Sequence, residues 1–325
     1  MKKILLFACG LFFSLNLSAQ GNLEKGLQYY NWREYKTALP YLQAAAKEGY
    51  GEACYLLGEM YYYGYGTDKN YTIAVRMYQR GIEYGFTKGE AELGRMYENG
   101  EGVTKDSEKA FSFYLQSSSR GNLLGKYLLA RSYYHGLGTS EDNEKAFALF
   151  YSLSKNTVFE KEYKWAHRWT YAYLGHCYKS GYGTPQDLEQ AVISYYRSDI
   201  AEYLFRAAQL VEEYKLSIYP NGSGSLFRLS PGYLYELAVR KGFDNAEAYY
   251  KKVFYLSKEK PFYNDYIKDL IKSAEMGYGP AQKLLGDWYK EGKGTPVNLI
   301  KAREWYAKAK ANGEEIPEQA AAADR

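Results

Sequence analysis

Histidine is the side chain best suited to metal binding and to acid–base chemistry near neutral pH, and this sequence has three. His167 and His176 lie nine residues apart, which does not match the i, i+4 spacing of a metal-binding pair on one helix. His135 stands directly before a glycine, where similar segments of the chain carry Tyr, Asn, Ser or Glu. The histidines therefore indicate no catalytic site and no metal site, and we predict no cofactor.

Two serine–lysine pairs match the Ser-x-x-Lys motif of penicillin-binding enzymes. They are Ser152 with Lys155 and Ser257 with Lys260. Neither is accompanied by a Lys-Thr-Gly or Ser-Asp-Asn motif, and so short a pattern arises by chance in a lysine-rich chain. The pairs do not indicate an enzyme by themselves. They leave open, as an alternative, a cell-wall or carbohydrate-binding protein, including an enzyme of β-lactamase or penicillin-binding type.

Glycine pairs of the form Gly-x-Gly recur along the chain, but their context does not fit phosphate binding. The stretch GKGT at Gly292 lacks the upstream glycine that a P-loop needs. A dinucleotide-binding glycine motif follows a β-strand, whereas each pair here follows a helical pattern. We therefore predict a structural role for the paired glycines. They are Gly64, Gly66, Gly100, Gly102, Gly136, Gly138, Gly181, Gly183, Gly292 and Gly294.

These glycines belong to a sequence repeat, which fixes the spacing of several other residues. The first glycine of each pair lies six residues after the second member of a Leu-Gly or Leu-Ala pair. From that first glycine, an Asn or Asp follows at six residues, an alanine at ten and an aromatic residue at fourteen. Five copies share every offset, and the first three copies are spaced at 36 residues. Chance does not produce such agreement.

Each copy predicts two helices joined by a glycine turn. In the first copy, apolar spacing indicates a helix A over 52–63 and a helix B over 71–84. Gly64 stands where a helix C-terminal glycine belongs, and Asn70 stands where an N-cap belongs. The 39 tyrosines suit a thin structure, because a tyrosine ring can be buried while its hydroxyl reaches the surface.

The repeat resembles the Sel-one-like repeat family, a relative of the tetratricopeptide repeats. The resemblance covers about half the chain and includes YLLGEMYYYGYGTDKNYTIAVRMYQRGIEYGF and KLLGDWYKEGKGTPVNLIKAREWYAKAKANG. It implies an all-α fold, a right-handed α–α superhelix (solenoid) of about seven to eight helix pairs. The departures are local: Ala130 replaces the helix A glycine, and Thr157 and Glu202 replace the glycine that ends helix B. The loop at 155–164 carries nine extra residues.

The N-terminus has the pattern of a secretory signal peptide, with two lysines, an apolar run and a cut expected after Ala19. Lipoprotein anchoring at Cys9 is not favoured, because a cut there leaves only eight residues for the signal. No later segment has a long charge-free apolar run, so we expect an exported protein, periplasmic or secreted, without a transmembrane segment. The predicted divisions are a signal peptide at 1–19, an N-terminal capping helix pair at 20–50, repeats 1–4 at 51–198, degenerate repeats at 199–278 with a loop insertion near 220–231, a final repeat at 279–313 and a disordered tail at 314–325.

Charge and cysteine content argue against nucleic-acid binding and against a disulfide. Without Lys2 and Lys3 the net charge is +2, which supplies no electrostatic footprint for nucleic acid. The two cysteines beyond the signal, Cys54 and Cys177, lie three repeats apart, so we expect no disulfide between them. Cys177 occupies the position of Met60 in the first copy and is expected in the core.

The resemblance implies that helix A lines the concave face of the superhelix. Some helix A positions vary between copies while the repeat residues around them do not, which suits a recognition surface. Solvated helix positions would vary in the same way. Tyr and Arg, which occur at these positions, are enriched at binding hot spots. We therefore expect a scaffold or adaptor outside the cytoplasm that binds a peptide or protein partner of the cell envelope on this face, and not an enzyme. The predicted contact residues are Tyr55, Glu59, Tyr62, Arg95, Glu98, Tyr127, Arg131, Tyr134, His176 and Lys179.

Overall fold

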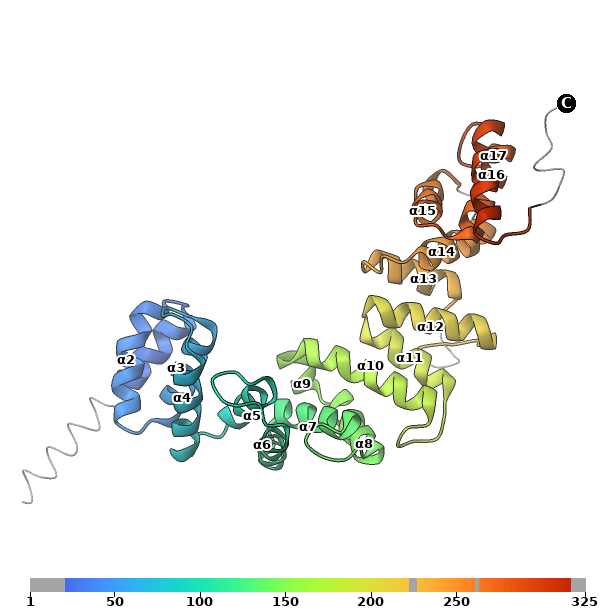
Figure 1. The fold of residues 1–325 in the computed structure, drawn as a ribbon. Helices are drawn as coiled ribbons and strands as arrows, with labels where there is room; N and C mark the ends of the chain where they lie inside the picture. The colour runs from blue at the N-terminus through green and yellow to red at the C-terminus, as the bar shows by residue number, and fades with distance from the viewer. Residues whose placement is uncertain (1–20, 222–226, 261–262, 317–325) are drawn as a thin grey trace, which may run out of the picture. The chain divides into compact units, whose positions relative to one another are not determined.

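A computed structural model shows a succession of α-helices, and most helices pack against the next one along the chain (Figure 1). The structure describes residues 21–221, 227–260 and 263–316. Within these ranges it contains no β-strand, and the predicted all-α solenoid is confirmed. The contacts divide the chain into unit 1, Met1–Ala166, and unit 2, His167–Arg325, which are described separately.

From residue 21 onward, where its description begins, unit 1 contains four helix pairs and one additional short helix. The first pair is formed by the helical residues 21–31 and α2 (Tyr35–Lys47). In the next three pairs the first helix is helix A and the second is helix B. They are α3 (Gly51–Tyr63) with α4 (Tyr71–Glu83), α5 (Gly89–Asn99) with α6 (Ser107–Ser119), and α7 (Leu123–His135) with α8 (Asn143–Ser154).

The nine-residue insertion after α8, expected as a loop, contains the short helix α9 (Thr157–Glu162). Asn156 caps this helix by accepting a hydrogen bond from the Phe159 backbone N–H at 2.8 Å. The Phe159 side chain is fully buried, with its ring centroid 6.2 Å from that of Tyr127. The insertion therefore adds to the core of unit 1.

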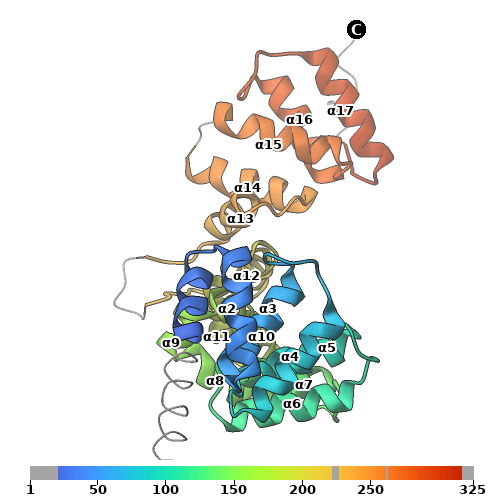
Figure 2. The same ribbon diagram turned by 90° about the vertical axis from the view of Figure 1, so that its left-hand side faces the viewer.

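Unit 2 continues the same arrangement from α10 (Lys164–Ser180), within which the boundary between the units falls. The described residues of the segment predicted as degenerate repeats form four helices, and the last pair stands beside α15 at the end of the unit (Figure 2). The helices that follow α10 are α11 (Leu188–Ser198), α12 (Ala201–Tyr214), α13 (Pro231–Arg240), α14 (Ala246–Glu259), α15 (Tyr263–Glu275), α16 (Gly279–Glu291) and α17 (Leu299–Ala311). Helices α10, α12, α14 and α16 are in the helix A position of their pairs.

The same two features recur at the helix ends: a glycine after helix A and an N-cap side chain before helix B. The first glycine of each pair has a left-handed backbone, as at Gly64 with φ 78°, and the Gly64 N–H donates to the Met60 carbonyl at 2.9 Å. The predicted N-cap at Asn70 accepts from the Ile73 N–H at 2.9 Å. Asp106, Asp142, Asp187 and Asn298 cap the other repeat B helices in the same way.

The second glycine of each pair forms the joint between neighbouring repeats. A Cβ at Gly66 would lie 2.7 Å from the backbone nitrogen of Lys36, near the start of α2. A Cβ at Gly294 would lie 2.6 Å from the Tyr263 carbonyl oxygen, at the start of α15. At Gly66, Gly102, Gly138 and Gly294, the missing side chain lets the turn rest on the first turn of the preceding helix B.

The helix A glycine and the helix B aromatic residue pack directly on each other. A Cβ at Gly58 would lie 2.5 Å from the ring of Tyr78, and a Cβ at Gly286 would lie 2.6 Å from the ring of Tyr306. Both rings are buried. The third repeat has Ala130 and Phe150 at these two positions, and both are fully buried there.

Several predictions concern segments at the edges of the described ranges. The signal peptide and Cys9 lie outside the described residues, as do 222–226 within the loop predicted near 220–231. On either side of 222–226, Ile218 and Leu229 are buried and form an antiparallel bridge. The start of the predicted tail packs on the last repeat, through Ile316 and through the Glu315 carbonyl, which accepts from Lys283 Nζ at 2.7 Å.

Candidate partner-binding site

Glu59 lies on the helix A face of unit 1, where two tyrosines hold it. Its carboxylate accepts hydrogen bonds from the Tyr30 hydroxyl at 2.9 Å and from the Tyr55 hydroxyl at 3.0 Å. Burial raises the pKa of this carboxyl, although both hydrogen bonds oppose the rise. Two of the predicted contact residues, Tyr55 and Glu59, are therefore brought together and are bonded to each other.

Glu98 and Arg131 form an ion pair that joins the helix A faces of the second and third repeats. Glu98 also accepts a hydrogen bond from the hydroxyl of Tyr114 at 2.6 Å. The ring of Tyr114 is buried on helix B, so its hydroxyl reaches the helix A face from behind. These two predicted residues stabilise the joint between neighbouring repeats, and their charges largely satisfy each other.

Arg95 and Tyr62 occupy the region between these groups. Arg95 donates to Glu92 at 2.9 Å and keeps about a third of its side chain exposed, and Tyr62 donates to Glu101 at 2.9 Å. Burial raises the pKa of Glu92, and the neighbouring Glu59 raises it further. The Arg95 side chain is more exposed than those of Glu98 and Arg131, and Tyr62 is half-buried.

The prediction that Tyr127 is available to a partner is wrong. Its side chain is 3% exposed, because the rings of Phe159 and Trp165 cover it, with the Trp165 centroid at 5.5 Å. Phe159 belongs to the nine-residue insertion and Trp165 to the start of α10, and the repeat spacing alone gave no sign of this cover. Tyr134, also predicted, is half-buried beside Phe150, with ring centroids 6.3 Å apart.

In unit 2, His176 and Lys179 lie on the exposed side of α10. His176 packs edge-on against Tyr195 and Tyr203, and its Nδ1 lies 3.3 Å from the Tyr195 hydroxyl. Lys179 is exposed. His176 is therefore part of an aromatic cluster, and Lys179 lies on the rim of the pocket described next.

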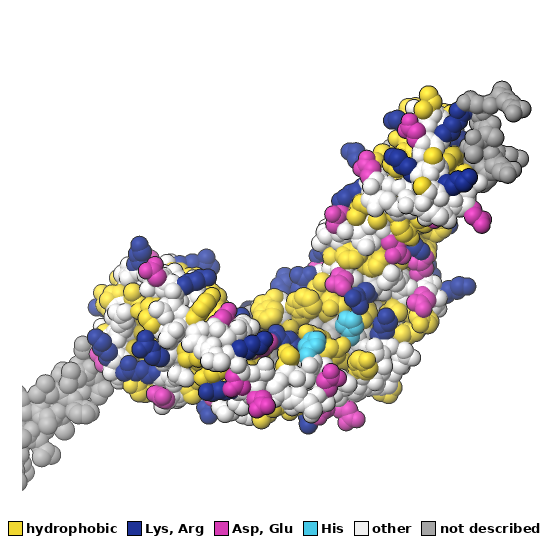
Figure 3. Space-filling model, in the orientation of Figure 1, with side chains coloured by type: hydrophobic (Ala, Val, Ile, Leu, Met, Phe, Trp, Pro, Cys, Tyr) yellow, Lys and Arg dark blue, Asp and Glu magenta, His cyan; other side chains and the backbone are white. Residues whose placement is uncertain are grey.

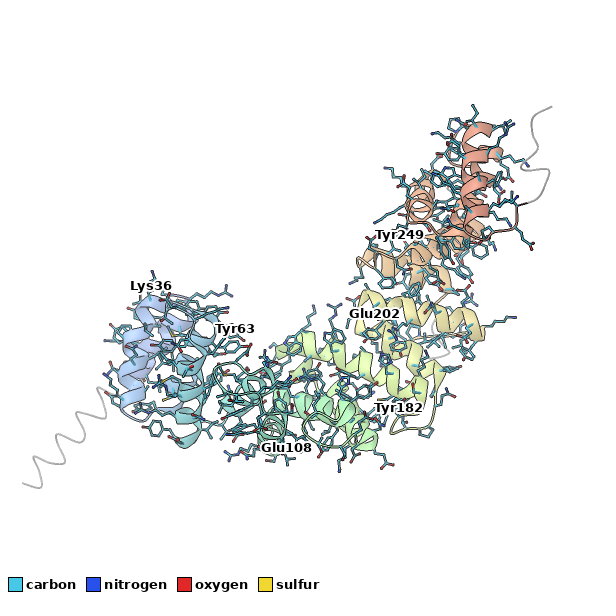
Figure 4. All side chains as sticks on the ribbon, in the orientation of Figure 1. Lys36, Tyr63, Glu108, Tyr182, Glu202 and Tyr249 are labelled. Atoms are coloured by element: carbon cyan, nitrogen blue, oxygen red, sulfur yellow. The ribbon has the colours of Figure 1, made fainter. Side chains whose placement is uncertain are left out.

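A pocket of about 660 Å³ opens along α12 in unit 2. Its floor is apolar and is formed by Phe205, Leu210 and Phe243, with the Phe205 and Phe243 ring centroids 4.9 Å apart. Lys179 and Glu202 contribute to its rim, and Figure 4 labels Glu202 at the start of α12. Its volume is within the range of small-ligand and side-chain sites.

Some polar side chains around the pocket already form ion pairs or hydrogen bonds within the protein, and others do not. Arg206 is paired with Glu202 at 2.7 Å, and Glu212 is paired with Lys251 of α14 and accepts from Tyr235 at 2.7 Å. The pKa of Glu212 is lowered because these bonds outweigh its burial. Other polar groups of the lining are not held in this way, and among the described residues no bond is found for the side chains of Lys179, Gln209 and Glu213.

Sequence reasoning missed this pocket except for Lys179. The other lining residues belong to α11, α12 and the segment before α14, and most lie where the glycine turns that align the repeats are absent. The spacing Glu202, Phe205, Arg206, Gln209 and Glu213 is nevertheless one helical face. Reading α12 as a helix A could have identified that face.

The residues considered for catalysis do not form a catalytic arrangement in the described part of the chain. Ser152 accepts from Lys126 Nζ at 2.8 Å, while Lys155 lies over the ring of Tyr151. Cys54 and Cys177 are buried free thiols, and burial raises the pKa of Cys177 to about 12. No group of three metal-ligating side chains is found among the described residues, and no described helix is long and apolar enough to cross a membrane.

Five segments of the sequence match the family model of the Sel1 repeat, and together they make up half of the chain. The chain belongs to the Sel1 repeat family. Sel1-repeat proteins serve as protein-interaction scaffolds, and the family is generally non-catalytic. The matched segments are 51–85, 87–122, 124–156, 171–193 and 279–314.

Two solved structures are similar to the chain over most of its length. One is a Sel1 repeat protein from Oxalobacter formigenes, with 20% identity, a TM-score of 0.43, and coverage of 89% of this chain and 85% of that one. The other is a protective antigen of uropathogenic Escherichia coli strains with an SLR fold, with 20% identity, a TM-score of 0.43, and coverage of 90% and 76%. No curated protein matches the sequence.

Proposed function

We propose that this Sel1 repeat protein is an adaptor that holds an extended segment of a protein partner in the pocket along α12. The observation that carries the proposal is the pocket itself, which combines an apolar floor with unbonded polar groups on a helix A face. Phe205 and Phe243 provide a place for an apolar anchor side chain, the kind of contact that dominates interface energies. The pocket lies on a rigid stack of helices, which limits the entropy lost on binding.

The polar groups of the pocket suit a peptide backbone better than a free ion. The Gln209 amide can donate to a peptide carbonyl and accept from a peptide N–H. Lys179 and Glu213 carry opposite charges, so the lining has no strong preference for one sign of ligand charge. A peptide with an apolar residue and a mixed-charge flank fits this lining.

The proposed place of action is outside the cytoplasm, in the periplasm or beyond, with a partner from the cell envelope. The support for this is the N-terminal pattern of lysines, apolar run and small residues. Fractionation of cells that produce the full chain tests it. The proposal expects the protein in the exported fraction without residues 1–19, and uncleaved protein in the cytoplasm contradicts it.

The binding role is tested by affinity capture from envelope extracts, with partners quantified by mass spectrometry. Lys179→Ala combined with Gln209→Ala removes two unbonded lining groups without touching the apolar floor. The matched control is Gln190→Ala, an exposed glutamine on the helix B α11. We expect a stoichiometric protein partner that the control retains and the pocket variant loses. Equal capture by all three proteins contradicts the pocket as the binding site.

A further inference from the structure

Six tyrosine rings form a continuous run in unit 1, at the joint between the first helix pair and the first repeat. Tyr35 stacks on Tyr65 with centroids 4.7 Å apart, and Tyr65 stacks on Tyr63 at 5.2 Å. The run extends edge-on from Tyr35 to Tyr30 at 5.2 Å and from Tyr63 to Tyr62 at 4.8 Å. Tyr71 completes it, 5.2 Å from Tyr62.

The repeat pattern does not require an aromatic residue at two of these positions, Tyr63 and Tyr65. The position of Tyr63 carries Asn99, His135, Ser180 and Glu291 in the other copies, and the position of Tyr65 carries Glu101, Leu137, Tyr182 and Lys293. Tyr63 is 40% exposed and Tyr65 is 37% exposed. Hydrophobic side chains, tyrosine included, reach the surface over α2 and α3 (Figure 3), and Tyr63 is labelled at the end of α3 (Figure 4). Exposed aromatic rings at variable positions favour a binding role over a packing role.

Two tyrosine hydroxyls of this surface are available for hydrogen bonding, while its carboxylates are not. The nearby carboxylates are occupied: Glu59 accepts from Tyr30 and Tyr55, and Glu101 accepts from Tyr62. By contrast, no hydrogen bond is found within the described residues for the hydroxyls of Tyr35 and Tyr65. Each of these hydroxyls can donate to an acceptor of a ligand, such as a peptide carbonyl.

The arrangement of the rings further restricts the ligand. The stacked faces of Tyr35, Tyr65 and Tyr63 cover one another, so few ring faces remain for stacking on a sugar. Burial raises the pKa of the Tyr63 hydroxyl, the positive charge of Arg95 opposes that rise, and this charge disfavours a cationic ligand. Ring edges and hydroxyl groups remain available. These are the features with which aromatic grooves bind polyproline II helices, whose carbonyls are unbonded and whose prolines lack an N–H donor.

We infer that this run of rings, the tyrosine column, binds a proline-rich segment of a partner protein in the polyproline II conformation. Prolines pack against the edges of Tyr63 and Tyr65, and the hydroxyls of Tyr35 and Tyr65 donate to peptide carbonyls. The inference rests on the proposed function in treating the protein as a peptide-binding scaffold. It names a partner class for unit 1 and does not use the α12 pocket.

The test is a fluorescence anisotropy titration of the full exported chain with fluorescein-labelled decaproline. We expect saturable binding that weakens about thirty-fold in Tyr63→Ala combined with Tyr65→Ala, the size of a hot-spot loss. Tyr65→Phe keeps the ring but loses one donor, and we expect about a five-fold weakening. The control, Tyr84→Ala combined with Tyr182→Ala, removes two comparably exposed tyrosines elsewhere and should bind as the wild type does.

Absence of saturable decaproline binding to the wild type, or an unchanged affinity in the Tyr63→Ala, Tyr65→Ala variant, overturns the inference. A parallel titration with N-acetylchitotetraose separates the other ligand class. Binding of that sugar alone, lost in the same variant, would assign the column to glycans and would also overturn the inference. The capture test with the Lys179 and Gln209 substitutions is independent, so either proposal can fail while the other holds.

Discussion

Replacing Gly58 with alanine tests the contact that holds helix A to helix B in each repeat. The new Cβ would lie 2.5 Å from Cε1 and 2.6 Å from Cδ1 of Tyr78, a ring that is 1% exposed. At such distances the ring or the helix must move, and overpacking of this kind costs about 1–3 kcal/mol. Alanine also favours a helix over glycine by about 1 kcal/mol. We therefore expect the free energy of unfolding to fall by about 1 kcal/mol.

The third repeat suggests a compensating change. It carries Ala130 and Phe150 where the first repeat carries Gly58 and Tyr78. Without a hydroxyl, the ring can slide away from the helix A backbone. We expect the variant with both Gly58→Ala and Tyr78→Phe to be about 1 kcal/mol more stable than the sum of the two single changes predicts.

Urea unfolding followed by circular dichroism measures all three variants. Ala130→Gly is the matched control, because it reverses the substitution where no tyrosine is present. We expect this control to lose about 1 kcal/mol from helix propensity, plus the loss of a buried methyl group. The reasoning is refuted if Gly58→Ala stabilises the protein by about 1 kcal/mol, or if the double variant is strictly additive.

Three further changes test other parts of the structure. Glu90 is fully buried, its carboxylate has no hydrogen bond, and Arg120 lies 3.4 Å from it. Burial raises the pKa of Glu90, so the stability of the protein falls as the pH rises and this carboxyl ionises. Glu90→Gln should therefore stabilise the protein by about 1–2 kcal/mol at pH 7 but hardly at pH 4, as measured by urea unfolding at both pH values. Lys215 ends α12 with φ 51°, and Lys215→Gly should raise the free energy of unfolding by about 1 kcal/mol. Tyr127→Ala should lower the free energy of unfolding by about 3–5 kcal/mol because the ring is buried, whereas Arg95→Ala should lower it by under about 1.5 kcal/mol. Thermal melts in which Arg95→Ala lowers the melting temperature more than Tyr127→Ala does would contradict our placement of the two side chains.

The regular part of the fold could be predicted from the sequence because it rests on local, repeated chemistry. The glycines after helix A, such as Gly64 and Gly100, have the expected left-handed backbone, and Asn70 and Asp106 cap the next helix. Cys177 is in the core as expected. Each of these features depends on residues within about one repeat of each other, so their spacing carries the information.

The candidate site was less predictable because it depends on contacts that spacing does not encode. Tyr127 has the same offset as Tyr55, yet Phe159 of the insertion and Trp165 of α10 cover it. Glu98 and Arg131 have the appearance of recognition residues, yet they bond to each other across a repeat joint. The pocket along α12 lies mainly in a segment whose repeat signature has been lost. The binding roles of the predicted helix A residues therefore stay predictions.

The central claim is that a partner segment lies in the α12 pocket, and site-specific photo-crosslinking tests it most directly. A benzophenone amino acid replaces Gln209 inside the pocket, or Gln190 on the exposed side of helix B as the control. Irradiation in envelope extracts is followed by identification of the crosslinked peptide by mass spectrometry. We expect one extended partner peptide with an apolar residue, crosslinked at position 209 and not at position 190. The same partner crosslinked at 190 and not at 209 would contradict it.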